Sequence, residues 1–177
     1  MARRRLAVAL VLEGEPALEV DGLRRAVGGD RTRVAPHVTL IPPINVGVEA
    51  LPEVVELLRS AAASVQPFDL LIGPARTFAP TTPVLYLDIS GDVASVEALR
   101  AALDVAPLSR PAEHPFVPHM TLGEELEPAR IEAALTALAD FELLWPIRSV
   151  FLLEDRAPGP HRWNPVAEAR LGDGRSP

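Results

Sequence analysis

The sequence predicts an α+β fold, because short apolar strand candidates and amphipathic helix candidates are mixed without the strict alternation of a parallel α/β protein. Two observations predict two similar halves: the string P-H-x-T-L occurs twice, and each copy precedes a helix candidate that begins near a proline. We therefore expect a bilobal protein with pseudo-two-fold symmetry, two small, mainly antiparallel sheets, helices on the outer faces and a central cleft. The length suits a single domain over residues 1–177, with residues 172–177 as a frayed tail.

Hydrophobic periodicity and the residues that start or stop each element predict the order of strands and helices. The first strand candidate, residues 6–12, is followed by a helix from Pro16 to the glycine pair at 28–29, with Leu18, Leu23, Ala26 and Val27 as its apolar stripe. The next strand, residues 37–41, is expected to stop at two prolines, which cannot donate ladder hydrogen bonds. Further strands are expected at 68–72, 84–89, 120–122, 141–153 (one strand or a pair) and 166–171, and further helices at 51–65, 93–103 and 128–139.

The amino-terminal segment superficially resembles a signal peptide, because three arginines at positions 3–5 precede an apolar run. That run is short, Glu13 ends it, and no small-residue cleavage site follows. No stretch approaches the roughly 20 apolar residues of a membrane span. We expect a buried first strand and a cytoplasmic protein that does not associate with membranes.

Composition excludes several classes of chemistry. The chain has no cysteine, which excludes disulfides, thiolate metal sites and a cysteine nucleophile. All 17 basic residues are arginines, which excludes a P-loop lysine and a Schiff-base lysine. The net charge of −7 makes long duplex nucleic acid a poor partner, since duplex binding rests on many phosphate contacts. A small nucleotide or a single RNA end is compatible with this charge, and we expect a monomer.

The repeated pentapeptide is the most informative feature of the sequence. Its two copies, residues 36–40 and 118–122, match at four of five positions, and the fifth is apolar in both. In a strand, residues i and i+2 point to one face, so His37 and Thr39 project together while Val38 and Leu40 point into the core. In the second copy, His119 and Thr121 share one face, and Met120 and Leu122 share the other.

Two histidines and two threonines around one small volume suit phosphoryl transfer by general acid–base catalysis. Histidine titrates near neutral pH, so one ring can accept a proton while the other donates one. Threonine hydroxyls can hydrogen-bond the non-bridging phosphate oxygens as charge develops. The histidine spacing is not a local metal-ligand pattern, so we expect no metal and no cofactor.

The paired strings, the order of the elements and the phrase P-H-V-T-L-I-P-P resemble the 2′-5′ RNA ligase and cyclic phosphodiesterase group, also called 2H phosphoesterases. The resemblance covers nearly the whole chain. It implies a bilobal α+β fold with a central cleft, and it implies His37, Thr39, His119 and Thr121 as the catalytic set. It also implies action on 2′,3′-cyclic phosphates or on 2′-5′ bonds, without a metal cofactor.

One departure from the family pattern concerns the residues after the second motif. Many relatives carry an arginine there, whereas this chain has Gly123-Glu124-Glu125, whose charges would disfavour a phosphate if they faced the cleft. This argues against ligation of tRNA-sized RNA. Three other residues are candidates to supply the missing positive charge, and two aromatic residues are candidates to contact the substrate. The candidate substrate-binding residues are Arg76, Arg110 and His114, together with Tyr86 and Phe116.

Structural roles compete with these assignments. Tyr86 and Phe116 are also explained as packing residues, and His114 as a loop residue. His161 lies in a segment rich in proline and glycine, where we expect it to be solvent-exposed.

The predicted function is a metal-independent phosphodiesterase acting on a 2′,3′-cyclic phosphate or a 2′-5′-linked nucleotide or RNA end, with paired histidines as acid and base. One alternative is a nucleotide-binding module that keeps the cleft but has little turnover. A second alternative is a 2′-5′ RNA ligase. The expected partner is a small nucleotide or an RNA terminus. The sequence does not decide which histidine is the acid and which is the base.

Overall fold

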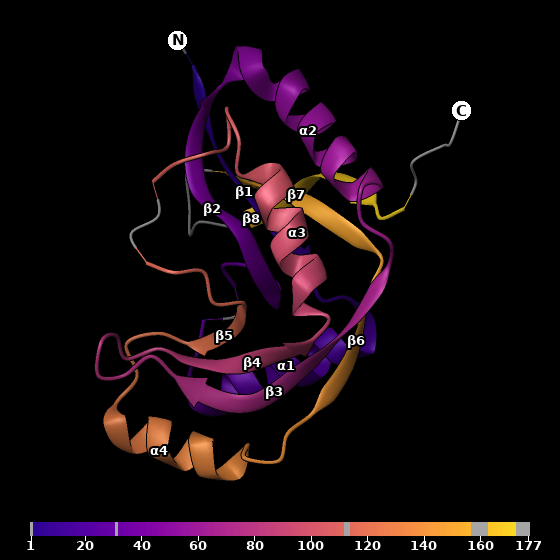
Figure 1. The fold of residues 1–177 in the computed structure, drawn as a ribbon. Helices are drawn as coiled ribbons and strands as arrows, with labels where there is room; N and C mark the ends of the chain where they lie inside the picture. Colours follow the sequence, from indigo (N-terminus) through magenta and orange to yellow (C-terminus); the bar gives the residue numbers. More distant parts are fainter. Residues whose placement is uncertain (1, 31, 112–113, 157–162, 173–177) are drawn as a thin grey trace.

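The computed structural model describes residues 2–30, 32–111, 114–156 and 163–172, and these residues form the expected α+β fold (Figure 1). Within them, eight strands form two four-stranded antiparallel sheets, accompanied by four α-helices. The elements are β1 (Arg3–Val11), α1 (Gly14–Val27), β2 (His37–Gly47), a 3-10 helix (Val48–Ala50), α2 (Leu51–Ala63), β3 (Phe68–Thr77), β4 (Leu85–Gly91), α3 (Val93–Leu103), β5 (His119–Gly123), α4 (Pro128–Ala137), β6 (Leu143–Ile147), β7 (Ser149–Asp155) and β8 (Trp163–Arg170).

The two sheets have matching strand orders, as pseudo-two-fold symmetry requires. Sheet A has the order β2-β1-β7-β8, and sheet B has the order β5-β4-β3-β6. The unit β1-α1-β2-α2 therefore corresponds to β4-α3-β5-α4, and α2 and α4 both have a proline in their first turn. Each strand that carries a motif is an edge strand, placed beside the strand that precedes it in its own unit.

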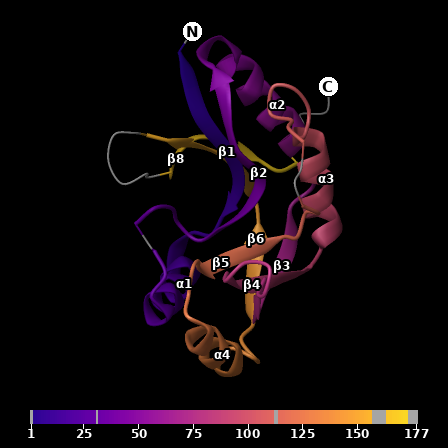
Figure 2. The ribbon, with the colours of Figure 1, turned by 90° about the vertical axis from the view of Figure 1, so that its left-hand side faces the viewer.

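The helices cross between the halves. Helix α1 follows a strand of sheet A but packs against β5 of sheet B, whereas α3 follows a strand of sheet B but packs against β2 of sheet A. Figure 2 shows α1 and α4 on the lower lobe, and α2 and α3 side by side on the upper lobe. Each motif strand is therefore supported by a helix from the opposite half, and β2 and β5 contact each other directly.

The core confirms the alternation predicted for the motif strands. Val38, Leu40, Met120 and Leu122 are buried, while the histidines and threonines between them are half-buried. Full burial of a side chain of this size contributes roughly 1.5–3 kcal/mol. One continuous apolar cluster contains residues from both sheets, so the motif strands are anchored from behind by the same core.

Strand β2 is longer than predicted, because it continues through Pro42 and Pro43 to Gly47. The pairing with β1 is irregular at this point, since its register shifts between Leu6 and Val8. Proline is tolerated at such an irregularity and on an edge strand, where a ladder donor is not required. The expected stop at residue 41 was therefore wrong.

Two other strand predictions differ from the structure. Strand β3 passes Gly73 and Pro74 because its register with β4 shifts between Ile72 and Ala75, and Gly73 has a φ of 114°. The segment 141–153 holds a strand pair, but β6 belongs to sheet B and β7 to sheet A. The chain thus returns from one lobe to the other at Arg148.

The first and last described segments of the chain, β1 and β8, both belong to sheet A. The apolar part of β1 is buried, as expected for a first strand. The Gly172 backbone N–H donates to the Ala62 carbonyl at 3.1 Å, and the rest of the expected tail lies outside the described residues. Among the residues that the structure describes, no helix is long and apolar enough to cross a membrane.

The turn after α1 approaches the second motif strand closely. Gly28 ends the helix in the left-handed conformation, with a φ of 80°, and a Cβ atom on the next residue, Gly29, would overlap the Leu122 carbonyl oxygen. At Gly22, inside α1, no atom beyond the neighbouring residues and the surrounding helix backbone lies within 4 Å of the position that a Cβ would take. Alanine substitutions at Gly29 and Gly22 therefore distinguish the cost of a close backbone contact from the effect of helix propensity.

We predict that Gly29→Ala lowers the free energy of unfolding by about 1–3 kcal/mol, because the backbone of β5 must shift. Gly22→Ala should raise it by about 1 kcal/mol, since alanine favours the helix interior. Chemical denaturation of both variants measures the difference. Equal stability of the two variants would contradict the close approach of this turn to β5.

Candidate functional site

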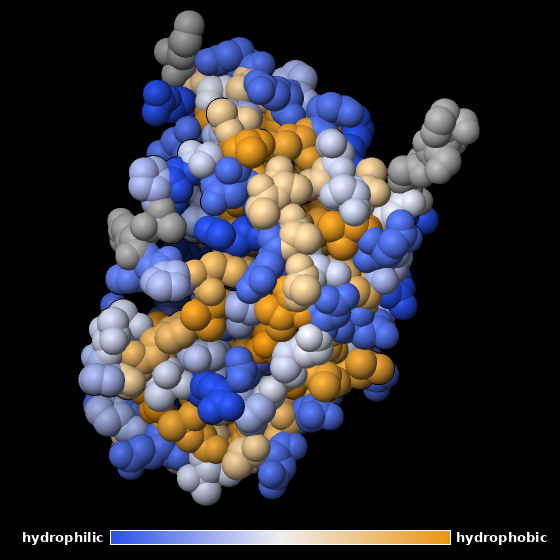
Figure 3. All heavy atoms as spheres, in the orientation of Figure 1, coloured by the Kyte–Doolittle hydropathy of each residue, from blue (hydrophilic) through white to orange (hydrophobic). Residues whose placement is uncertain are grey.

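A cavity of about 630 Å³ between the lobes is lined by both motifs, with His37 and Thr39 from β2 and His119 and Thr121 from β5. A second cavity of about 270 Å³ shares Thr39 and His119 with the first. The space-filling view shows the hollow between the upper and lower lobes at its left side (Figure 3). The predicted juxtaposition of the two motifs is thus present.

Strand pairing sets the position of each polar side chain. On sheet A, Thr39 pairs with Ala9 and His37 with Val11. The alanines on this face of β1 are small, which leaves room above the sheet, and Ala9 itself lines the larger cavity. On sheet B, Thr121 pairs with Tyr86 and His119 with Asp88.

Both catalytic candidates make the same hydrogen bond to the backbone. Nδ1 of His37 bonds the Ala35 carbonyl at 2.8 Å, and Nδ1 of His119 bonds the Val117 carbonyl at 2.7 Å. A carbonyl oxygen can only accept, so Nδ1 carries the proton in each ring. Nε2 is therefore the nitrogen available to a substrate in both motifs. The repeated bond is local evidence for pseudo-two-fold symmetry at the site.

The two histidines differ in their electrostatic surroundings. The pKa of His37 is lowered from 6.5 to about 4, mainly by burial; the hydrogen bond to Ala35 opposes this, and the positive charges of Arg24 and His119 contribute to the lowering. His37 is therefore neutral at pH 7, and its Nε2 has a free lone pair. A proton acceptor is thus available in the cleft at neutral pH.

An aromatic cluster holds the other ring. Phe78 meets His119 edge-on, with 5.0 Å between centroids, and Tyr86 meets it at 5.4 Å. Tyr86 also stacks on Phe78 at 4.3 Å. Tyr86, a candidate for substrate contact, faces away from the core of sheet B, but it lines neither cavity and is only 6% exposed, and burial raises its pKa. Its contacts position His119.

Arg24 is the main feature of the cleft that sequence reasoning missed. The side chain is 3% exposed, and its guanidinium donates to the Thr121 carbonyl at 3.1 Å and to the Val34 carbonyl at 2.9 Å. It therefore joins β5 to the segment that leads into His37. Burial lowers its pKa, while nearby Asp21, at 3.6 Å, favours the charged form.

Sequence reasoning missed Arg24 because it assigned the apolar, core-facing stripe of α1 to other residues. The buried face of the helix consists of Val20, Arg24 and Val27, whereas Leu18 is 72% exposed. The sequence did contain a signal: Arg24 lies four residues after Val20 and three before Val27, which places all three on one face of the helix. The predicted stripe was therefore wrong in part: Val27 is buried and Leu23 packs against the core, but Leu18 and Ala26 are exposed.

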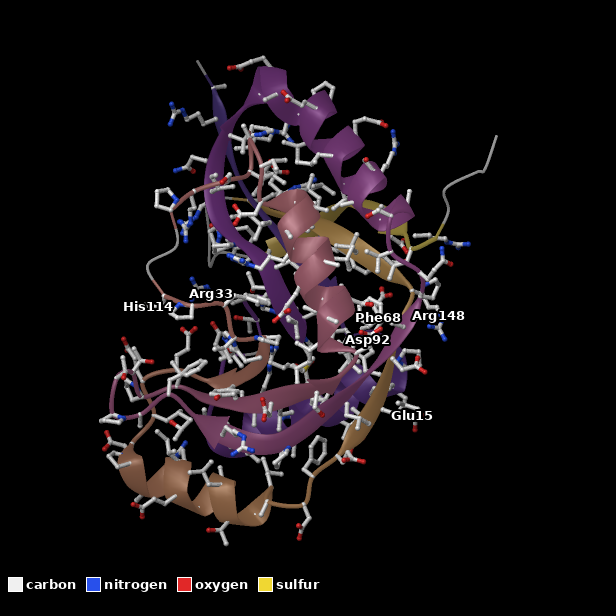
Figure 4. All side chains as sticks on the ribbon, viewed as in Figure 1. Glu15, Arg33, Phe68, Asp92, His114 and Arg148 are labelled. Carbon is white, nitrogen blue, oxygen red and sulfur yellow. The ribbon has the colours of Figure 1, made fainter. Side chains whose placement is uncertain are left out.

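The acidic residues after the second motif do face the larger cavity, which Glu124 and Glu125 both line. Arg33 lies 3.9 Å from Glu124, and both side chains are at least half exposed, so this pair contributes little to stability. Arg33 and His114 both lie at the mouth of the cleft in Figure 4. The mouth of the cleft therefore carries both positively and negatively charged side chains.

The remaining candidates divide into two groups. Arg110, His114 and Phe116 line the smaller cavity, and Arg110 donates to the Pro43 carbonyl at 2.9 Å. Arg76 lines neither cavity; it pairs with Asp88 at 2.8 Å, and this hydrogen bond raises the pKa of Arg76. The smaller cavity also contains a residue that was not predicted, Arg100, whose guanidinium lies 4.7 Å from the Phe116 ring. His161 lies outside the described residues.

Among the described residues, no group of three or more histidine, aspartate or glutamate side chains is placed to hold a metal ion.

Comparison with known proteins defines the class to which this fold and cleft belong. Residues 12–159 match the 2′-5′ RNA ligase superfamily, so the chain belongs to this family of phosphoesterases. A protein of Bacillus cereus strain B4264 named "Putative phosphoesterase" is 30% identical over 160 residues, which cover 89% of this chain and 91% of that protein. A protein of the same name from Bacillus anthracis strain A0248 is 29% identical over the same shares.

Solved structures share the fold. A protein of Thermus thermophilus superposes with a TM-score of 0.69 at 21% identity, covering 97% of this chain and 100% of that chain. Escherichia coli LigT complexed with 3′-AMP superposes with a TM-score of 0.68 at 18% identity, covering 96% of this chain and 99% of that chain. These likenesses establish the two-sheet architecture.

We predict that Arg24→Met raises the pKa of His37 above about 4, because it removes a positive charge that disfavours the imidazolium. It should also lower stability by about 1–3 kcal/mol, since two buried carbonyls lose their donor. NMR titration of the histidine ring measures the pKa. The matched control is Arg130→Met, which removes an arginine that donates to the Val27 carbonyl at 3.1 Å and lines neither cavity.

The control should lower stability without moving the pKa of His37. An unchanged His37 pKa in Arg24→Met would show that Arg24 acts on the fold alone.

Proposed function

We propose that this protein is a metal-independent phosphodiesterase that cleaves a 2′,3′-cyclic phosphate or a 2′-5′-linked nucleotide, free or at an RNA end. The observation that carries the proposal is the equivalence of the two motifs. Each comes from an edge strand of its sheet, each lines the same cavity, and each histidine bonds a backbone carbonyl through Nδ1. The arrangement supplies two Nε2 atoms and two hydroxyls to one phosphate.

His37 is the general base and His119 the general acid in this proposal. The low pKa of His37, about 4, keeps its ring neutral at pH 7. The water oxygen bonds to phosphorus while His37 Nε2 takes the water proton. The bond from phosphorus to one ribose oxygen breaks, and His119 Nε2 gives its proton to that oxygen. Exchange with solvent then returns both rings to their starting states.

The remaining groups of the cavity stabilise the charge that develops on phosphorus. The hydroxyls of Thr39 and Thr121 donate to the two non-bridging oxygens. Arg24 lies behind Thr121, bonded to its carbonyl at 3.1 Å, and supplies the positive charge that the sequence lacks after the second motif. The guanidinium does not have to move during the reaction, because its hydrogen bonds to two backbone carbonyls already hold it in place.

The smaller cavity is the proposed site for the nucleoside. It begins at Thr39 and His119 and continues past Phe116, His114 and Arg110. The complex of the structurally similar LigT with 3′-AMP supports a nucleotide as ligand. On the opposite side, Glu124 and Glu125 line the larger cavity and oppose a second polyanionic strand, which favours hydrolysis over ligation.

A product assay tests the reaction directly. We expect turnover of at least one of the four nucleoside 2′,3′-cyclic phosphates, undiminished by EDTA, because the protein supplies its own acid and base. Chromatography that resolves 2′- from 3′-phosphates gives the regiochemistry. Loss of activity on chelation, restored by one divalent ion, would contradict the mechanism. Tight binding of these nucleotides and of 2′-5′ dinucleotides without turnover would instead favour a nucleotide-binding module.

Mutation and pH test the paired histidines. His37→Ala and His119→Ala should each lower turnover by about 10²–10⁴-fold, and the double variant should lose little more, because the two groups act in one displacement. Thr39→Ala and Thr121→Ala should cost less, since proton transfer is retained. Thermal melts control for folding, which should be nearly unchanged because these side chains face the cleft.

The wild-type rate should follow a bell-shaped pH profile whose limbs belong to the pair of histidines, and the low pKa of His37 should shift the acidic limb from pH 6.5 toward pH 4. Full activity of folded His119→Ala would overturn the two-histidine mechanism.

A further inference from the structure

Strand β1 carries a line of residues that leads out of the cleft. Successive residues of a strand alternate between faces, so Arg3, Arg5, Ala7 and Ala9 share one face. The two alanines line the larger cavity beside the catalytic candidates. The pairing of β1 with β7 is regular over residues 6–9, so the alternation is not interrupted there. The two arginines therefore continue the same face beyond the cavity.

At this end of β1 a separate hollow gathers positive charge in a chain whose net charge is −7. Glu154 is buried and already engaged by two of the arginines, Arg4 at 3.1 Å and Arg156 at 3.3 Å. Among the described residues, neither Arg3 nor Arg5 has an ion-pair partner. The hollow is lined by Arg3, Arg4, Arg5, Asn45, Glu154, Asp155 and Arg156.

Trp163 lies between the two hollows. It lines the larger cavity, and the guanidinium of Arg5, which lines the other hollow, lies 6.0 Å from the centroid of its ring. Opposite Arg5 on β2 is Asn45, which adds an amide donor to the same hollow. An indole face and guanidinium groups are the side chains that bind the bases and phosphates of single-stranded nucleic acid.

The distances along the strand indicate which phosphate these arginines can reach. Ala9 pairs with Thr39, and Arg5 is four residues away, roughly 13 Å at the rise of an antiparallel strand. Arg3 is roughly 20 Å from the same point. Neither residue is placed for the phosphate that lies between the histidines. Both are placed for further phosphates of a longer chain.

We propose that Arg3, Arg5 and Trp163 form a second subsite, which binds the phosphates and a base of a single-stranded RNA whose terminal phosphate enters the cleft. The preferred substrate is then an oligonucleotide end and not a free mononucleotide. This inference rests on the proposed function, and it locates RNA binding on one local surface of an acidic protein.

The test compares two substrates that share the same reacting group. One is a nucleoside 2′,3′-cyclic phosphate, and the other is a single-stranded RNA of about six nucleotides that ends in the same group. Arg3→Gln/Arg5→Gln should raise KM for the RNA about tenfold and leave kcat, and KM for the mononucleotide, unchanged. For single strands each lost contact should reduce the slope of log affinity against log salt by about 0.7, so the double variant should lose about 1.4.

The matched control is Arg59→Gln/Arg148→Gln, which removes the same charge from exposed positions on other surfaces. Arg148 lies on the side of the molecule away from the cleft mouth in Figure 4. This control should leave KM for the RNA and its salt slope unchanged. Equal KM values for the RNA in the two double variants would overturn the subsite.

Binding of labelled RNA to His119→Ala, measured by fluorescence anisotropy, separates this proposal from the catalytic one. If the RNA binds and the Arg3→Gln/Arg5→Gln change weakens it, the subsite stands even where turnover fails. If both substrates are hydrolysed with the same KM, the subsite is wrong while the proposed reaction holds.

Discussion

The site depends on the crossed packing of α1 and α3. Each helix leaves the sheet of its own half and covers the motif strand of the other, so the two edge strands are held face to face by structure from both halves. Arg24 reinforces this contact within the cleft, because one buried guanidinium bonds the backbone of the second motif at Thr121 and of the segment before the first motif at Val34. A buried charge is tolerated only with such partners. The relative position of the two histidines therefore depends on the packing of the two lobes against each other.

Pseudo-symmetry makes the two motifs similar, and departures from it make them chemically different. The backbone hydrogen bonds at Nδ1 are the same in both copies. The surroundings are not, because His37 lies near the Arg24 charge while His119 lies against two aromatic rings. The two pseudo-symmetric halves thus place identical side chains in different surroundings, and the acid and base roles proposed above rest on this difference.

Sequence reasoning was most successful where a local pattern has a direct geometric meaning. The alternation in P-H-x-T-L predicted which residues face the core, and the repeat predicted two matching sheets. It was less successful where tertiary context decides. Pro42 was assigned as a strand end although an edge strand tolerates it. Arg24 was overlooked because the apolar stripe of α1 was assigned to other residues, although its spacing from Val20 and Val27 places it on the buried face. Tyr86 was placed on the correct strand, whereas Arg76 lies in β3 beyond the predicted strand end at residue 72. The ion pair of Arg76 with Asp88 and the stacking of Tyr86 on Phe78 could not be deduced from strand periodicity.

The prolines of β2 have a further consequence, which concerns association between molecules. An edge strand exposes unpaired backbone groups that can pair with the strand of another chain. Both motif strands are edge strands, so the catalytic candidates lie on the strands whose unpaired backbone groups could pair with another chain. Pro42 and Pro43 remove two consecutive N–H donors from β2, and β5 is only five residues long. These features discourage the addition of a foreign strand, so the edge that carries the chemistry stays open to the cleft.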